Sequence, residues 1–345
     1  MTTEILPEKQ PINEHRLSQL KAVAGNGPVL ITTHDNPDPD SLASGAVLAA
    51  LFRSAWNIHC HLVYGGLVAR AENKAMLSLL TPEWEQIEVI NDLDRYSCLA
   101  MVDTQPGAGN NRVPVEFTPG IVIDHHIPKR EGLEKVPFVD VRTELGATVS
   151  LLYQYLEQAG IEPHSDLATA IFYGIQSDTQ GLSRGGSKTD QDVYFKMLTR
   201  IDRQKLALIE QAGLPREYFQ VFHRGLQSAR LYGRAVISYL GPIHRPDFVA
   251  EIADLLIRLD GTRAVLCLGH HDETMYLSLR TAMDGYDAGG LIQRVIFPPG
   301  NAGGHGSVAG GQVRMAGSQP DLIARKLKDR FLEAMGEKRP GTPIL

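Results

Sequence analysis

Cysteine is scarce in this sequence, and its distribution excludes two kinds of stabilised fold. The three cysteines, Cys60, Cys98 and Cys267, lie far apart in apolar, strand-like segments. No two of them form a Cys-x-x-Cys pair, so neither a zinc site nor a disulfide framework is expected. Reduced cysteines in core-like positions are typical of proteins from a reducing compartment, and we expect a cytoplasmic location.

Long hydrophobic runs are also missing. The longest apolar stretch, residues 42–52, is much shorter than the roughly 20 residues that span a bilayer. Residues 1–16 are polar and lack the apolar core of a signal peptide. We therefore expect no association with membranes.

Positive charge is in deficit, because the 345 residues carry a formal net charge of -6. No large basic field is available to bind long DNA or RNA, and no long duplex nucleic acid is expected as a partner. Trp56 and Trp84 read as core or interface residues, so no aromatic platform for a long single strand is apparent. A small anionic substrate would need local positive charge from metal ions or a few arginines.

Short apolar runs alternate with helical patterns in the first half of the chain. This alternation is typical of a mostly parallel, doubly wound α/β sheet. Strands are predicted at residues 29–33, 58–64, 86–90, 98–102 and 120–123. Helices are predicted at residues 41–55, 71–80, 147–158, 167–176 and 190–200.

The second half has a different order of elements and predicts a smaller α/β domain. Helices are expected at residues 217–231, 248–259, 290–297 and 321–335, and strands at 235–240, 264–268 and 275–280. A glycine-rich loop is expected at residues 300–311. We predict domains at residues 1–200 and 217–345, joined by a linker or a connecting helix at residues 201–216.

Acidic and histidine side chains follow predicted strands or helices at four places in the first half. They are His34, Asp38 and Asp40 after the first strand, Asp103 after the strand at 98–102, the run Asp124-His125-His126 after the strand at 120–123, and Asp178 after the helix at 167–176. Ligands of open parallel sheets bind outside the carboxyl ends of the strands, so these side chains are expected to converge on one site.

Carboxylates that are packed together repel one another unless cations neutralise them. Carboxylate oxygens combined with imidazoles suit Mn²⁺ or Mg²⁺, whereas zinc sites more often recruit thiolates. Two such ions about 3.5–4 Å apart can activate a shared water and stabilise phosphoryl transfer. Each feature alone also fits a structural role, such as a turn or a helix cap, but all four in this order favour a two-metal centre.

At these residues the sequence resembles the DHH phosphoesterase family, which is named for its Asp-His-His motif. His34, Asn36-Pro37-Asp38 and Asp40 match the first motif, Asp103 the second, Asp124-His125-His126 the third and Asp178 the fourth. In overall length the chain most resembles members of the branch that contains nanoRNases and 3′-phosphoadenosine-5′-phosphate phosphatases. The resemblance implies a DHH domain, a smaller substrate domain and an active site in the cleft between them.

The resemblance also implies a role for each motif residue. His34, Asp38 and Asp103 would bind one metal ion, and Asp40, Asp103, His125 and Asp178 would bind the other, with Mn²⁺ favoured over Mg²⁺. His126 would face the scissile phosphate, and Asp124 would orient the histidines. A hydroxide bridging the two metals would be the nucleophile.

The substrate-binding residues implied by the resemblance lie mostly in the second half. Asn301-Ala302-Gly303-Gly304-His305 is similar to the family's Gly-Gly-Gly-His signature, and Arg280 to its phosphate-binding arginine. Exposed N–H groups beside the glycines would bind an anion, and Arg184 would add positive charge near Asp178. The alternatives are a flexible turn and a surface arginine. Ala302, and residues 180–184 after Asp178, depart from the family pattern.

The function that follows is metal-dependent hydrolysis of short oligoribonucleotides, 3′-phosphoadenosine 5′-phosphate or linear dinucleotides, by a chain that the resemblance suggests is a homodimer. A manganese inorganic pyrophosphatase or exopolyphosphatase is the first alternative. Those enzymes use a cluster of basic residues in the second domain, where this chain has a Gly-Gly-His segment. A non-catalytic nucleotide sensor is the second alternative, and the complete set of candidate ligands disfavours it.

Overall fold

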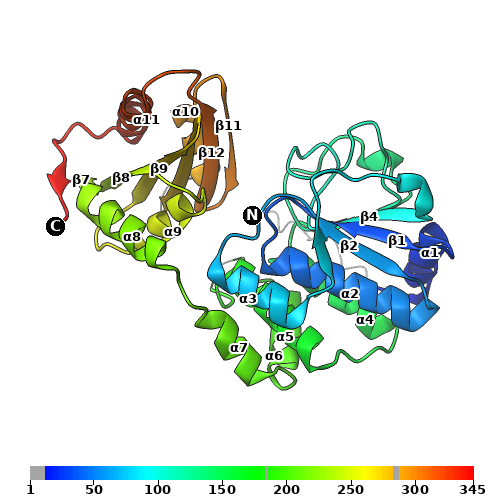
Figure 1. Cartoon of the computed structure of the whole chain (residues 1–345). Helices are drawn as coiled ribbons and strands as arrows, with labels where there is room; N and C mark the ends of the chain where they lie inside the picture. The colour runs from blue at the N-terminus through cyan, green and yellow to red at the C-terminus, as the bar shows by residue number, and fades with distance from the viewer. Residues whose placement is uncertain (1–11, 184, 283–286) are drawn as a thin grey trace, which may run out of the picture. The chain divides into compact units, whose positions relative to one another are not determined.

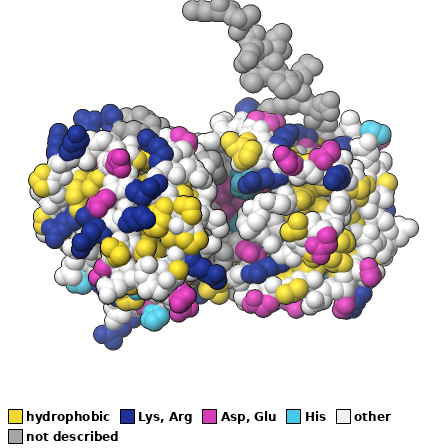
Figure 2. All heavy atoms as spheres, turned by 90° about the horizontal axis from the view of Figure 1, so that it is seen from above, with side chains coloured by type: hydrophobic (Ala, Val, Ile, Leu, Met, Phe, Trp, Pro, Cys, Tyr) yellow, Lys and Arg dark blue, Asp and Glu magenta, His cyan; other side chains and the backbone are white. Residues whose placement is uncertain are grey.

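The computed structural model describes residues 12–183, 185–282 and 287–345. The chain forms two compact units, Met1–Ala212 and Gly213–Leu345 (Figure 1). Of the described helices, none combines the length and the apolar character needed to cross a membrane. On the face seen in Figure 2, basic side chains are scattered among acidic and apolar ones.

The first unit is built on a six-stranded parallel sheet of order β3-β2-β1-β4-β5-β6. The strands are β1 (Val29–Thr32), β2 (Cys60–Tyr64), β3 (Trp84–Gln86), β4 (Cys98–Val102), β5 (Ile121–Asp124) and β6 (Phe138–Val141). The central strands are buried on both faces, as their continuous apolar sequences require. The predicted α/β fold with a parallel sheet is confirmed.

Seven α-helices accompany this sheet among the described residues, namely α1 (Glu14–Ala24), α2 (Pro39–Trp56), α3 (Ala71–Leu80), α4 (Thr148–Gln158), α5 (Ser165–Thr179), α6 (Lys188–Leu198) and α7 (Arg203–Glu210). The largest apolar cluster joins α2, α4 and α5 to one sheet face. The cluster on the opposite face is completed by loops and by the 3-10 turns η1 (Leu93–Arg95) and η2 (Leu133–Lys135). The sheet is therefore covered differently on its two faces.

The elements of the first unit differ from the sequence predictions at β3, β6 and α1. The strand expected at residues 86–90 is β3, which begins at Trp84 and pairs with β2, while Ile87 and Ile90 pack from a loop onto the second apolar cluster. The short strand β6 and the helix α1 were not predicted. The segment expected to link the domains contains α7, which packs against α3 and α5.

The second unit contains a seven-stranded mixed sheet of order β11-β12-β10-β9-β8-β7-β13. Its strands are β7 (Arg230–Tyr232), β8 (Ala235–Pro242), β9 (Ala264–His271), β10 (Thr274–Thr281), β11 (Gly300–His305), β12 (Val308–Arg314) and β13 (Thr342–Pro343). Helices α8 (Arg216–Ser228) and α9 (Phe248–Leu256) pack on one face of this sheet. Helices α10 (Ala288–Val295) and α11 (Pro320–Met335) pack on the other.

The prediction of a glycine-rich loop at residues 300–311 is wrong, because this segment forms the hairpin of β11 and β12. Some of its glycines are needed for close packing, whereas Gly306, with a φ of 54°, lies in the turn between the strands. A Cβ atom on Gly304 would lie 2.3 Å from the Cβ of Ala309, so no side chain fits there. These strands were not predicted because the segment has few of the β-branched and aromatic residues that are typical of β-strands.

Candidate metal centre

The candidate ligands lie where the strand order of the first sheet reverses. The chain moves from β1 to β2 and β3 on one side, and then returns to place β4 on the other side of β1. His34 follows β1, Asp103 follows β4 directly, and His125 directly follows the neighbouring strand β5. This reversal is the position at which open α/β sheets bind their ligands.

The loop between β1 and α2 positions Asp38 and Asp40. Asp38 caps α2, because its carboxylate accepts a hydrogen bond from the Ser41 amide at 3.0 Å, and the Ser41 hydroxyl accepts one from the Asp38 amide at 3.0 Å. Asn36 has a left-handed backbone with φ of 59°, and its side chain accepts a hydrogen bond from the Leu67 amide at 2.8 Å. The loop therefore directs both acidic residues from a rigid helix start.

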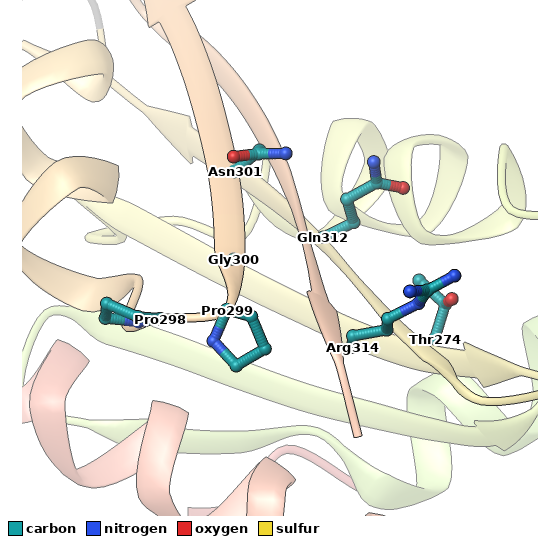
Figure 3. A pocket seen from close by; sticks show the side chains of 7 residues that line it. All are labelled: Thr274, Pro298, Pro299, Gly300, Asn301, Gln312 and Arg314. Atoms are coloured by element: carbon teal, nitrogen blue, oxygen red, sulfur yellow. The ribbon is translucent and has the colours of Figure 1, made fainter. Parts of the chain in front are cut away.

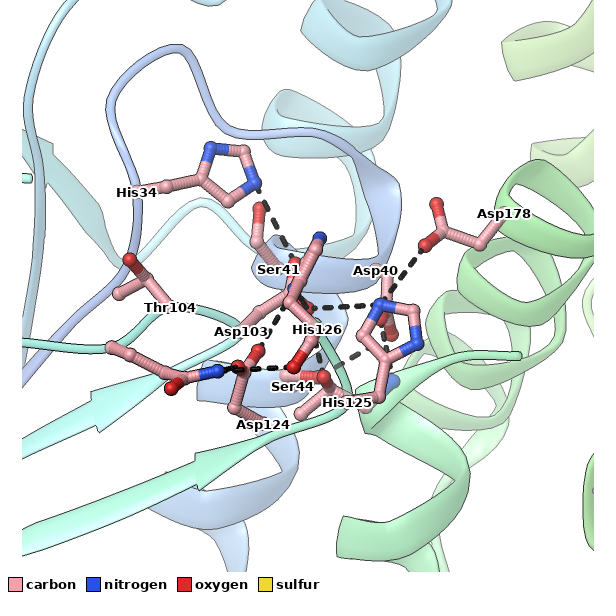
Figure 4. A network of polar contacts seen from close by, with 12 residues as sticks. His34, Asp40, Ser41, Ser44, Asp103, Thr104, Asp124, His125, His126 and Asp178 are labelled. Carbon is pink, nitrogen blue, oxygen red and sulfur yellow. Dashed lines mark hydrogen bonds and ion pairs between the residues drawn. The ribbon is translucent and has the colours of Figure 1, made fainter. Parts of the chain in front are cut away.

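His34, Asp38 and Asp103 form the first candidate ligand group (Figure 4). The Nδ1 of His34 lies 2.9 Å from the carbonyl oxygen of Asp35. Because a carbonyl oxygen only accepts, Nδ1 is the donor in this contact, and Nε2 is the ring nitrogen that faces the carboxylates. That Nε2 lies 3.7 Å from Asp38 Oδ2 and 3.5 Å from Asp103 Oδ2.

Asp40, His125 and Asp178 form a second group, and Asp178 reaches it from the end of α5 (Figure 4). The Nδ1 of His125 lies 3.1 Å from the carbonyl oxygen of Leu145, so Nδ1 is the donor in this contact and Nε2 faces the carboxylates. This Nε2 lies 3.6 Å from both Asp178 Oδ2 and Asp103 Oδ1. The carboxylate of Asp103 therefore lies between the two groups.

The positions of the donor atoms in these groups are better suited to binding divalent cations than to hydrogen bonding with one another. Among the described residues, Asp103 Oδ2 and His125 Nε2 are buried and have no hydrogen-bond partner. The Nε2 atoms of His34 and His125 lie 3.5–3.7 Å from the nearest carboxylate oxygens, which is longer than a normal hydrogen bond. Oxygen and nitrogen ligands held about 2.0–2.2 Å from one cation are typically separated by distances of this order. The positive φ of Asp103, 57°, is a strained conformation of the kind found at functional sites.

The electrostatics of the site indicate a deficit of positive charge. Burial and the charges of Asp103 and Asp178 raise the pKa of Asp40 well above its ordinary value. Burial and the charges of Asp38 and Asp103 likewise raise the pKa of Asp178. Burial opposes protonation of His34, but the carboxylates of Asp103 and Asp38 raise its pKa overall. A divalent cation would replace these protons as the source of positive charge.

His126 is held differently from His125. Its Nδ1 donates to Asp124 Oδ1 at 2.9 Å, and Asp124 Oδ2 accepts a hydrogen bond from Gln105 Nε2 at 2.6 Å. Burial opposes protonation of His126, but the charge of Asp103 and the hydrogen bond to Asp124 raise its pKa to about 9. Asp124 therefore orients His126, whereas the Leu145 carbonyl orients His125. We expected Asp124 to orient both histidines.

The start of α4 supplies contacts to the ligands that the sequence did not reveal. The backbone amides of Thr148 and Val149 donate to the two carboxylate oxygens of Asp40 at 2.6 and 2.8 Å. The hydroxyl of Thr148 donates to Asp103 Oδ1 at 2.7 Å. Helix N-termini favour negative charge, so α4 helps to hold the carboxylates close together. A threonine next to a predicted helix start was the only signal for this role.

Replacing Thr148 with valine is expected to weaken Mn²⁺ binding by roughly 10- to 100-fold, which is typical of losing a residue that orients a metal ligand. Valine keeps the volume of the side chain but cannot donate to Asp103. Isothermal titration with Mn²⁺ measures the change, and Thr148→Ser, which keeps the hydroxyl, is the matched control. Equal Mn²⁺ affinities for the valine and serine variants would show that the hydroxyl does not position Asp103.

The residues expected to bind substrate are less exposed than the sequence suggested, or lie outside the described residues. Arg280 lies in β10, where its buried guanidinium pairs with Asp254 of α9 and donates to Ser278 Oγ at 2.8 Å. Gly303, Gly304 and His305 belong to strand β11 rather than to a loop. Arg184 and the His305 side chain lie outside the described part of the molecule. A role for these residues in substrate binding stays a prediction.

The fold and the site define a two-unit α/β protein with a carboxylate and imidazole centre at the switch point of a parallel sheet. Residues 28–175 match the model of the DHH family, N-terminal domain. The first unit is thus a domain of the DHH phosphoesterase family, as the motifs predicted.

Two known proteins are similar over most of the chain. An uncharacterized protein of Methanocaldococcus jannaschii, MJ1633, is 33% identical over 321 residues, which cover 90% of this chain. The match spans 65% of the length of that protein. The crystal structure of an exopolyphosphatase-related protein from Bacteroides fragilis aligns with a TM-score of 0.74 at 13% identity, covering 94% of this chain and 97% of that one. This second similarity shows a shared fold.

Proposed function

We propose that this chain is a two-cation phosphoesterase that hydrolyses short oligoribonucleotides or small nucleotide phosphates such as 3′-phosphoadenosine 5′-phosphate. The observation that carries the proposal is the position of Asp103, whose carboxylate faces His34 through one oxygen and His125 through the other. A shared carboxylate between two ligand groups is the arrangement that a pair of cations requires. Membership of the first unit in the DHH family supports the same chemistry.

Each group of residues has a definite part in this proposal. His34 and His125 direct their Nε2 atoms toward the ligand groups, while Asp38, Asp40 and Asp178 supply negative charge around Asp103. Divalent cations at such sites polarise phosphate oxygens and lower the pKa of bound water. His126, held by Asp124 and about 39% exposed, would carry positive charge toward a bound phosphate at neutral pH. We propose Mn²⁺ as the preferred cation because the donors combine imidazole with carboxylate.

The proposed substrate class follows from the negative net charge of the chain. The chain has a net charge of -6, and the basic side chains seen in Figure 2 are scattered. Long nucleic acids require many phosphate contacts with Lys and Arg, so a short or mononucleotide substrate is favoured. Arg280 is a proposed phosphate ligand, and it would have to exchange its pairing with Asp254 for the substrate.

The proposal is tested by incubating the full chain with RNA of two to five nucleotides, 3′-phosphoadenosine 5′-phosphate and pyrophosphate. Each substrate is assayed with Mn²⁺, with Mg²⁺ and after treatment with EDTA. We expect release of mononucleotides or phosphate from the nucleotide substrates with Mn²⁺, and none after chelation. Mn²⁺ added back in excess should restore the activity.

The same assay separates the alternatives. Hydrolysis of pyrophosphate alone would replace the proposal with an inorganic pyrophosphatase, an outcome that the name of the exopolyphosphatase-related structure makes worth testing. Nucleotide binding without turnover would favour a sensor. Nucleotide hydrolysis that persists in EDTA would contradict the requirement for cations.

A further inference from the structure

The second unit contains an open cavity of about 550 Å³ on the sheet formed by β10, β11 and β12 (Figure 3). Polar side chains from all three strands line it, together with two prolines at the start of β11. The lining residues are Thr274, Pro298, Pro299, Gly300, Asn301, Gln312 and Arg314. A cavity of this volume is in the usual range for small-molecule sites.

The register of the strands places the polar side chains on one face. Thr274 pairs with Arg314, and Asn301 pairs with Gln312. The intervening residue Val313 is buried in the apolar cluster of α10 and α11 on the opposite face. Side chains alternate along a strand, so Arg314, Gln312, Asn301 and Thr274 project together away from that cluster.

These polar groups are not engaged by the rest of the protein. Arg314, Gln312 and Asn301 are exposed, and within the described residues their side chains make no hydrogen bond or ion pair. Structural arginines on a sheet are commonly paired with carboxylates, as Arg280 is paired with Asp254. An arginine and two amides that converge on an open cavity are therefore available to a ligand.

The chemistry of the cavity matches a phosphorylated nucleoside. A guanidinium binds phosphate oxygens in bidentate fashion, and Asn and Gln amides pair with the hydrogen-bonding edges of nucleobases. The rings of Pro298 and Pro299 supply apolar surface beside these groups (Figure 3). Bare phosphate would use the arginine but neither the amides nor the prolines.

We propose that this cavity is a binding subsite for one nucleoside monophosphate unit, with Arg314 on the phosphate and Gln312 and Asn301 on the base. The biological role of this subsite rests on the proposed function, because the subsite would bind a second nucleotide of an oligonucleotide substrate. The cavity is built entirely from the second unit, so its binding can be measured without turnover.

The test is isothermal titration of the full chain with AMP, in a buffer free of divalent cations. AMP is expected to bind the unaltered chain, and Arg314→Ala is expected to weaken binding about tenfold or more, equivalent to about 1.4 kcal/mol. Gln312→Leu should weaken AMP binding while leaving the binding of inorganic phosphate unchanged. Asp103→Ala should bind AMP as the unaltered chain does, because Asp103 belongs to the metal centre.

Arg325→Ala is the matched control, because Arg325 is an exposed arginine on α11 of the same unit. Equal losses of AMP affinity in the Arg314 and Arg325 variants would show that the loss comes from the lower positive charge of the unit, and would overturn the subsite. Failure of AMP to bind the unaltered chain, or binding of inorganic phosphate as tight as that of AMP, would also overturn it. Specific AMP binding in a chain that hydrolyses no phosphoester would uphold the subsite and reject the proposed function.

Discussion

Replacing Asp103 with asparagine is expected to lower kcat/KM for a short RNA by roughly 10³-fold or more, which corresponds to about 4 kcal/mol of transition-state stabilisation. The reason is its position, since one carboxylate faces both His34 and His125 at 3.5 and 3.6 Å. Asparagine keeps the shape but removes the negative charge and one acceptor oxygen. Both ligand groups should therefore lose cation affinity together, which steady-state kinetics and Mn²⁺ titration would record.

Stability is not expected to fall in the same variant, because Asp103 is surrounded by carboxylates that repel it in the absence of cations. Thermal unfolding in EDTA should show the asparagine variant to be at least as stable as the unaltered chain. Asp94→Asn, at an exposed position of η1, is the matched control and should retain full activity. Full activity in the Asp103 variant would show that the shared carboxylate is not part of the catalytic site.

His126→Gln is expected to lower kcat by roughly 10²- to 10³-fold, as removal of one group that stabilises developing charge usually does. The ring of His126 is fixed by its hydrogen bond to Asp124 at 2.9 Å. Burial opposes its protonation, but the charge of Asp103 and the bond to Asp124 raise its pKa to about 9 in the cation-free protein, and the bond to Asp124 would remain when cations bind. Glutamine removes this positive charge but leaves His34 and His125 in place. The number of Mn²⁺ ions bound per chain should therefore not change.

Two measurements define the role of His126. His59→Gln, which alters an exposed histidine just before β2, should leave kcat unchanged. A decrease in the number of bound Mn²⁺ ions in His126→Gln would make His126 a metal ligand instead of a substrate contact. Unchanged kcat would exclude both roles.

The sequence predicted the parts of the fold that depend on local pattern. Continuous apolar runs such as residues 98–102 are found as buried parallel strands, because such runs need cover on both faces. The hairpin of β11 and β12 escaped prediction because the need for glycine at residue 304 arises only when the two strands pair, where an added Cβ would lie 2.3 Å from the Cβ of Ala309. A glycine-rich sequence alone does not distinguish a tightly packed hairpin from a flexible loop.

The candidate ligands were predictable for the same local reason, since His34, Asp103 and His125 all follow strands whose positions the pattern indicated. Their supporting contacts were not. Thr148 reaches Asp103 across 45 residues of sequence, and this pairing is created by the packing of α4 on the sheet. The ion pair of Arg280 with Asp254 likewise depends on the packing of α9 against β10. The sequence therefore did not indicate that this arginine is already paired with a carboxylate.

The most direct measurement is anomalous diffraction, near the manganese absorption edge, from crystals of the full chain grown with Mn²⁺. We predict two anomalous peaks on either side of the Asp103 carboxylate, one beside His34 and Asp38 and the other beside His125 and Asp178. A map with no manganese peak among these side chains, or with peaks only elsewhere, would contradict the two-cation centre.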